Sequence, residues 1–209
     1  MKTIYHLAGK SACSVFLLLA IAFFCTLIPI KAQAHPHVFV DCSLTFEFDE
    51  QGLKGVRQKW WFDEMFAAMI LGDFDVNHDN VLTSDEAKAL ENGAFVNLKN
   101  FDYFTRIVVD GKQFKSVDAV EFKPAIEDST LVYNFFVPLR IEDDNNKHIV
   151  MVAIFDESFY TSIQMDPQNK VLNIPAGFKL TLNLEPVAEM AYFFDQIVPE
   201  AAVLTLLPK

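Results

Sequence analysis

The sequence has few glycines and no enzyme signature, and both shortages narrow its possible functions. With 7 glycines among 209 residues, it contains no glycine-rich loop of the kind that cradles phosphate groups. Its serines and histidines form no recognisable nucleophile motif. It also has no internal repeat and no low-complexity linker. We therefore predict a binding or structural protein and no enzyme.

Cysteine is equally scarce. Of the three cysteines, Cys13 and Cys25 fall within the first 34 residues, which leaves Cys42 without a disulfide partner. A lone exported cysteine is either a reactive thiol, a soft metal ligand or a buried side chain. Cys42 lies in a segment where apolar and polar residues alternate, and this pattern favours a buried strand position.

The first 34 residues are predicted to be a signal peptide. Lys2 and Lys10 give a positive start, residues 14–30 are almost entirely apolar, and Ala32-Gln33-Ala34 is a small-x-small cleavage site. We expect cleavage after Ala34, export to the periplasm, and one mature domain of residues 35–209. An uncleaved membrane anchor is the alternative, although the apolar run is a little short for a span.

Loss of this leader would make the chain strongly acidic. The leader contains Lys2, Lys10 and Lys31, so 14 of the 17 basic residues would face all 28 acidic ones, for a net charge of −14. Such a charge argues against nucleic acid and anionic membrane surfaces as partners. It favours cations.

Residues 75–86 match the pattern of a 12-residue EF-hand calcium loop. In that pattern, alternate oxygens point inward and a final glutamate closes the shell with both carboxylate oxygens. Asn80 stands at position 6, where glycine is usual, and asparagine tolerates the left-handed backbone needed there. An acidic surface turn is the alternative. The predicted Ca2+ ligands are Asp75, Asn77, Asp79, Val81 through its carbonyl, Thr83 and Glu86.

Helical spacing on both sides of this loop predicts a helix-loop-helix. Trp61 to Leu71 has apolar residues at helical intervals, and Thr83 or Ser84 can cap a helix that begins at Asp85 and continues towards Leu98. We place this insertion at about residues 61–98. A single EF-hand within a larger domain more often has a structural role, holding two helices together, than a signalling role.

Cleavage after Ala34 would create a second candidate site. The mature chain would begin His35-Pro36-His37, which offers an α-amine and two imidazoles, and Asp41 could add an oxygen. Nitrogen-rich ligand sets suit Zn2+, Ni2+, Co2+ or Cu2+. Pro36 has no amide hydrogen to lose, which excludes the common amino-terminal copper and nickel motif. The alternative is a frayed terminus with two incidental histidines.

The rest of the sequence predicts strands, and the fold class is α+β with a mainly antiparallel β domain. Val38 to Phe48 alternates cleanly, and Val56 to Trp61 is expected to pair back on it after a turn flanked by Gly52 and Gly55. Val203 to Leu207 is predicted to be a last edge strand. The other predicted strands are Phe104 to Val109, Val117 to Phe122, Leu131 to Leu139, Ile149 to Phe155 (a central strand) and Gly177 to Leu184.

Several polar residues are expected to be structural. Asp63 and Glu64 are predicted to start a helix, since adjacent helical residues do not face each other. His148 is a weaker candidate for a third metal nitrogen. Asp156-Glu157 and Tyr160 are predicted to lie at the surface, where a strand ends.

The chain resembles a bacterial periplasmic family described as the periplasmic component of an uncharacterised ABC-type transport system. Members of that family often accompany nickel/cobalt- or zinc-type permeases. The resemblance implies a role in handling transition-metal ions, with His35 and His37 as ligands and an inner-membrane metal permease as partner. It rests on His35-Pro36-His37-Val38-Phe39-Val40-Asp41, on Trp60-Trp61-Phe62-Asp63-Glu64-Met65-Phe66, on the loop from Asp75, and on Tyr103-Phe104 leading to Val109-Asp110-Gly111-Lys112.

Two functions follow as hypotheses. In the first, the protein is a periplasmic accessory for Ni, Co or Zn transport, with Ca2+ in a structural site. In the second, it is a calcium-stabilised interaction module that docks on a membrane protein and has no role with transition metals.

Overall fold

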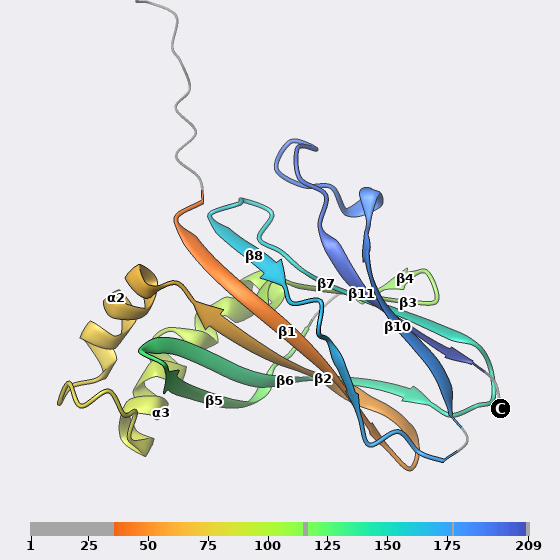
Figure 1. The fold of residues 1–209 in the computed structure, drawn as a ribbon, viewed down its shortest axis with the longest axis horizontal. Helices are drawn as coiled ribbons and strands as arrows, with labels where there is room; N and C mark the ends of the chain where they lie inside the picture. Colours follow the sequence, from red (N-terminus) through yellow and green to blue (C-terminus); the bar gives the residue numbers. More distant parts are fainter. Residues whose placement is uncertain (1–35, 115–116, 177, 208–209) are drawn as a thin grey trace, which may run out of the picture. The chain divides into compact units, whose positions relative to one another are not determined.

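The computed structural model describes residues 36–114, 117–176 and 178–207, and these residues form two β-sheets with a helical insertion (Figure 1). The predicted α+β fold, rich in antiparallel strands, is confirmed. One sheet, called sheet A here, has the order β5-β6-β2-β1-β8, with β9 also paired to β1. Its strands are β1 (Val38–Asp49), β2 (Gly52–Phe62), β5 (Val120–Glu127), β6 (Thr130–Glu142), β8 (Thr161–Met165) and β9 (Lys170–Leu172).

The second sheet, sheet B, has the order β10-β11-β7-β3-β4. The predicted central position of the Ile149–Phe155 segment is correct, because β7 lies between β11 and β3. The predicted edge position of the last strand is wrong, because β11 lies between β10 and β7. The strands of sheet B are β3 (Thr105–Val109), β4 (Lys112–Gln113), β7 (His148–Ile154), β10 (Lys179–Pro186) and β11 (Glu200–Leu207).

Strand β1 follows its sequence pattern closely. Every second residue from Val38 to Phe48 is buried, and the residues between them are exposed or half-buried. Cys42 is fully buried opposite Trp60 of β2, and burial raises the pKa of its thiol. A buried thiol of this kind is unreactive, so the structural interpretation of Cys42 is supported.

The boundaries around β2 differ from the prediction. Trp61 and Phe62 belong to the strand, where they pair with Asp41 and Val40. Gly52 and Gly55 both lie inside β2, so they do not flank the turn. The hairpin turn instead falls at residues 50–51. The predicted helix begins too early, at Trp61. The apolar residues at the end of β2 and those of the following helix together show helical spacing.

The two sheets share one hydrophobic core, and its aromatic part is formed by sheet A and η1 (Phe95–Phe104). Phe135 of β6 is fully buried, and its ring centroid lies 5.2 Å from that of Trp60 and 5.1 Å from that of Phe95. A buried polar link also crosses between the sheets. Gln58 of β2 donates from Nε2 to Thr105 Oγ1 of β3 at 2.9 Å, and its Oε1 accepts from Trp60 Nε1 at 3.0 Å.

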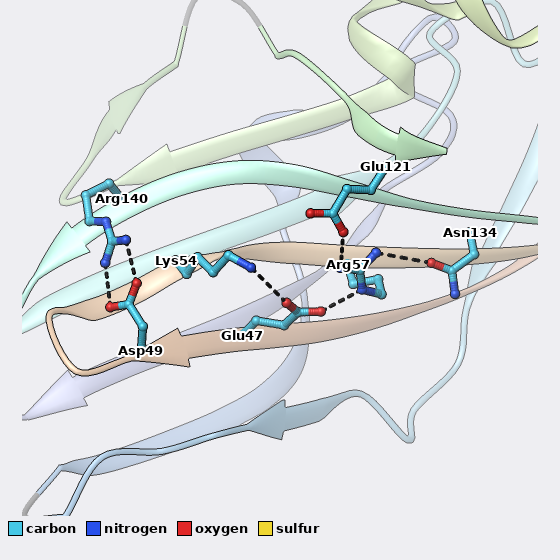
Figure 2. A network of polar contacts seen from close by, with 7 residues as sticks. All are labelled: Glu47, Asp49, Lys54, Arg57, Glu121, Asn134 and Arg140. Carbon is cyan, nitrogen blue, oxygen red and sulfur yellow. Dashed lines mark hydrogen bonds and ion pairs between the residues drawn. The ribbon is translucent and has the colours of Figure 1, made fainter. Parts of the chain in front are cut away.

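The outer face of sheet A carries ion pairs that connect its strands (Figure 2). Arg57 of β2 donates to Glu47 of β1 at 2.6 Å and to Glu121 of β5 at 2.7 Å. Arg140 of β6 binds both carboxylate oxygens of Asp49 and lowers the pKa of that carboxyl to about 2. Exposed pairs contribute little to stability individually. The pair of Arg57 with Glu47 joins adjacent strands, where opposite charges favour one register, while the other two pairs each span the strand that lies between their partners.

The helical insertion lies between β2 and β3, as the sequence predicted. It contains α2 (Glu64–Phe74), α3 (Ser84–Gly93) and the 3-10 segment η1 (Phe95–Phe104), which is followed directly by β3. The second helix therefore ends before Leu98, and the short helix η2 (Ala188–Met190) lies far along the chain, between β10 and β11. Among residues 36–114, 117–176 and 178–207, no helix has the length and apolar character needed to cross a membrane.

Candidate functional site

Helix α2 is anchored to the sheet by the carboxylate of Asp63. Its Oδ1 accepts hydrogen bonds from the backbone nitrogens of Met65 and Phe66, each at 3.0 Å, which caps the helix. Its Oδ2 accepts from the backbone nitrogen of Phe39 in β1 at 2.8 Å. The prediction that Asp63 and Glu64 start a helix is confirmed, and Asp63 has a structural role.

The loop of residues 75–86 joins α2 to α3 and places Asp75 in a buried position. Asp75 is 3% exposed, and its Oδ2 accepts from the backbone nitrogen of Asn80 at 3.0 Å. Its Oδ1 is buried and has no hydrogen-bond partner. Asn80 has φ +60°, the left-handed conformation that its place in the pattern requires. A buried carboxylate oxygen without a partner is rare and needs an explanation.

The middle of the loop is held by its own side chains. Asn77 Nδ2 donates to Asp79 Oδ2 at 2.9 Å, and Asn77 Oδ1 accepts from the Asp79 backbone nitrogen at 3.2 Å. Asp79 Oδ1 accepts from the backbone nitrogen of Val81 at 2.8 Å. The side chain of Val81 points to solvent, with 62% exposure. These hydrogen bonds, all between residues of the loop, hold the turn in its conformation.

Glu86 lies in the first turn of α3 and forms a reciprocal cap with Thr83. Glu86 Oε2 accepts from the Thr83 backbone nitrogen at 2.9 Å, and Thr83 Oγ1 accepts from the Glu86 backbone nitrogen at 3.3 Å. Glu86 Oε1 accepts from the backbone nitrogen of Val76 at 2.8 Å. The bonds from Thr83, backbone first and then hydroxyl, lower the pKa of Glu86. Helix capping alone therefore accounts for this residue.

The structure gathers all six predicted calcium ligands in one loop. Within the described residues, no group of three or more His, Cys, Asp or Glu side chains is arranged to hold a metal ion. Capping and turn formation explain every polar atom of the loop discussed above except Asp75 Oδ1.

The predicted amino-terminal site falls partly outside the described residues, since His35 is not among them. His37 is exposed just before β1, and its backbone nitrogen donates to the Tyr160 carbonyl at 2.8 Å. His37 lies at a bend just before β1 and Asp41 lies within β1, and both are exposed. Four residues of strand separate them by about 13 Å, so binding one ion together would require both side chains to lean along the strand.

A shallow acidic groove beside β1 was not predicted from the sequence. It has a volume of about 390 Å³, and Phe39 and Trp61 form part of its lining. At its edge, Lys59 binds Glu127 at 2.7 Å and lies 4.8 Å from the ring centroid of Trp61. Residues far apart in sequence meet here only through strand pairing, which no local pattern reveals. The carboxylates that line the groove are Asp41, Asp63, Glu127 and Asp128.

His148 is bound on both sides by carboxylates. Its Nδ1 lies 2.7 Å from Asp110 Oδ2 and its Nε2 lies 2.9 Å from Asp144 Oδ1. The hydrogen bond to Asp110, followed by the one to Asp144, raises the pKa of His148. Both ring nitrogens are occupied, so this arrangement favours an imidazolium that links two turns and gives no support to a third metal nitrogen.

This link should make stability depend on pH. Because the pKa of His148 is raised above its usual value of 6.5, the stabilisation is complete below about pH 6.5 and is lost as the pH rises through the folded-state pKa. We expect His148→Gln to lower the melting temperature by roughly 1–3 °C at pH 6 and by less at pH 9. Thermal melts across this range measure it, with exposed His78→Gln as the control. An equal effect at both pH values would contradict the assignment.

Asp156 departs from its prediction as a surface residue. It is 7% exposed, its Oδ1 accepts from the backbone nitrogen of Ser158 at 2.9 Å, and its Oδ2 accepts from that of Thr161 at 3.0 Å. The carboxylate thus shapes the connection that leads into β8. The sequence alone predicts that an acidic residue at the end of a strand is exposed to solvent. The backbone groups that bind Asp156 come near it only when the following turn has formed.

Comparison with known proteins gives a family. The chain is similar to an uncharacterised 15.5 kDa protein from the trpE 3′ region of Spirochaeta aurantia. The two are 30% identical over 137 residues, which cover 65% of this chain and 97% of that protein. Residues 20–196 match the model of a family described as proteins of unknown function. The chain therefore belongs to the DUF1007 family.

Proposed function

We propose that this protein binds divalent cations and that its loop of residues 75–86 holds one Ca2+ ion between α2 and α3. The observation that carries this proposal is Asp75 Oδ1, a buried carboxylate oxygen with no partner. Burying such a group without compensation is costly. A cation at the loop would supply the missing partner.

The backbone conformation of the loop favours a Ca2+ site over an acidic surface turn. The Ca2+ ion takes 6–8 oxygen ligands, and an EF-hand loop offers them at positions 1, 3, 5, 7, 9 and 12. Asn80 provides the left-handed residue at position 6, and α3 begins at Ser84, which is position 10. Binding would require Glu86 to exchange its bonds with Thr83 and Val76 for bonds to the ion. This exchange would weaken the affinity without preventing binding.

A calcium titration of the mature chain by calorimetry tests the proposal. We expect one site per chain and a rise in melting temperature with added Ca2+, since a ligand that binds only the folded state stabilises it. Absence of both effects would show that the loop is only an acidic turn. The role that best fits is a calcium-stabilised binding module.

A second candidate is the handling of transition-metal ions outside the inner membrane, in association with a metal permease. The acidic groove favours this role. Phe39, Asp41 and Asp128 line it, and the exposed His37 lies two residues before Phe39 in the chain. A cleft lined by one sign of charge raises the local concentration of cations. After the expected cleavage, His35 would add its amine and imidazole.

Titration of a chain that starts at His35 with Ni2+, Zn2+, Co2+ and Cu2+ tests this candidate. We expect His37→Ala to weaken binding by about tenfold or more, because it removes one of few nitrogen ligands. Residues added ahead of His35 should weaken it too, since they consume the amine. The control is His78→Ala, which removes an exposed histidine elsewhere. Unchanged affinity in His37→Ala would exclude the terminal site.

A further inference from the structure

Helix α2 is apolar on almost all sides, and one side packs on the core through Ala67 and the half-buried Phe66, Ile70, Leu71 and Phe74. Of its eleven residues only Glu64 and Asp73 are charged, and only Ala67 is buried. A helix that is apolar all round is normally enclosed by protein or lipid. One face of α2 therefore lacks a covering partner within the described part of the chain.

The uncovered residues form a regular stripe, called the α2 stripe here: Met65, Ala68, Met69, Gly72 and, just past the helix, Val76. The four residues within the helix lie on one helical face by their spacing, and Val76 follows the C-terminal cap Asp75. Met65 is 74% exposed, Met69 58% and Val76 76%. A Cβ added at Gly72 would meet nothing within 4 Å. Ala68 and Gly72 form a row of small residues beside the two methionines, which leaves room for the backbone of another helix to approach.

The charges beside the stripe indicate which partner would fit. Glu64 and Asp73 are both exposed at its margins, and α2 carries no basic residue. The loop that follows adds the exposed Asp79 and Asp85. An anionic lipid surface would be repelled by these carboxylates. A second copy of the chain would bring the same carboxylates against each other.

We propose that the α2 stripe docks an amphipathic helix of a partner protein that carries basic residues beside its apolar face. Such helices bind in apolar grooves through residues spaced at three and four positions. Methionine suits this role because its flexible, polarisable side chain adapts to different partner surfaces. Lysine or arginine on the partner would complement Glu64 and Asp73.

We further propose that Ca2+ strengthens this docking, which rests on the proposed function of the loop as a calcium site. Asp75 is the C-terminal cap of α2, and Glu86 lies in the first turn of α3. An ion bound to both would hold the end of α2 in place. Docking should therefore be stronger with Ca2+ than without it.

Binding of a fluorescently labelled amphipathic helix of leucine and lysine to the mature chain, followed by anisotropy, tests the proposal. The double variant M65Q/M69Q should bind about tenfold more weakly or worse, because two exposed apolar anchors are lost while glutamine preserves the helix. Leu172→Gln on β9 removes another exposed apolar side chain, 48% exposed, and should change nothing. A peptide with glutamine in place of lysine should also bind more weakly.

The outcomes separate docking from calcium binding. Equal binding by M65Q/M69Q and the unaltered chain would overturn the docking site. Two other results would also overturn it. If the unaltered chain self-associates in sedimentation experiments and M65Q/M69Q does not, the stripe binds a second copy. If the chain binds phosphatidylglycerol vesicles and M65Q/M69Q does not, the stripe binds lipid. If Ca2+ raises the melting temperature of M65Q/M69Q as it does that of the unaltered chain, a loss of peptide binding belongs to the stripe alone. If Ca2+ raises the melting temperature but does not change the affinity for the peptide, calcium binding and docking are not coupled.

Discussion

Replacing Glu86 with glutamine should abolish the rise in melting temperature that calcium gives the unaltered protein. With Ca2+ about 100-fold above its dissociation constant, that rise should be about 5–10 °C for a domain of this size. Glutamine keeps the reciprocal cap with Thr83, because either residue type can fill that position. It removes the charged, bidentate ligand that closes the calcium shell. Because glutamine has one acceptor oxygen, it loses the bond from the Val76 backbone nitrogen, so the calcium-free melting temperature should fall by roughly 2–4 °C.

Two further variants sharpen this experiment. Asp85→Asn removes the same charge from the same helical turn, at a position the ion does not use, and should keep the calcium response. Asp75→Asn should lose the response without loss of calcium-free stability, since Asp75 Oδ1 has no partner to lose. A calcium response that survives Glu86→Gln, measured by scanning calorimetry, would show that the ion binds elsewhere.

Phe135→Ala should produce the largest loss of stability among these variants. Phe135 is fully buried and its ring contacts those of Trp60, Phe95 and Tyr103. Truncating a buried phenylalanine lowers the free energy of unfolding by about 3–5 kcal/mol. In a domain of this size the melting temperature should fall by roughly 6–20 °C. Urea denaturation followed by the fluorescence of the neighbouring Trp60 measures the change.

The matched control is a phenylalanine that packs against little. Phe194 is 82% exposed, and Phe194→Ala should change the free energy of unfolding by no more than about 0.5 kcal/mol. Phe135→Leu should lie between the two, because it keeps most of the apolar volume. If Phe135→Ala and Phe194→Ala proved equally mild, Phe135 would not be at the centre of a tightly packed core.

The sequence predicted best what depends on neighbouring residues. The alternation of β1, the left-handed Asn80 and the capping of α3 by Thr83 all follow from local chemistry, and the structure reproduces them. Whether the loop binds calcium stays a prediction. A short-range pattern can specify which oxygens lie in one loop, but it cannot specify whether they turn towards an ion or towards nearby amides.

What the sequence missed depends on contacts between distant residues. The interior place of β11 follows from its pairing with β10, whose alternating polar pattern suits an edge. Asp156 looked exposed because the backbone groups it binds lie beyond the next turn. The acidic groove joins β1 to the turn between β5 and β6, so its carboxylates are neighbours only after the sheet has formed.

The parallel pairing of β1 bears on the order in which the chain can fold. Its register with β8 and β9 runs from Val38 opposite Thr161 to Glu47 opposite Leu172, and the backbone of Leu44 is also held by Asn169, 125 residues away. Contacts of such separation form late and slowly. During synthesis, one whole edge of β1 must wait until nearly all of the remaining chain has emerged. A ribosome-bound chain would therefore display an open strand edge, which makes chaperone protection most valuable at that stage.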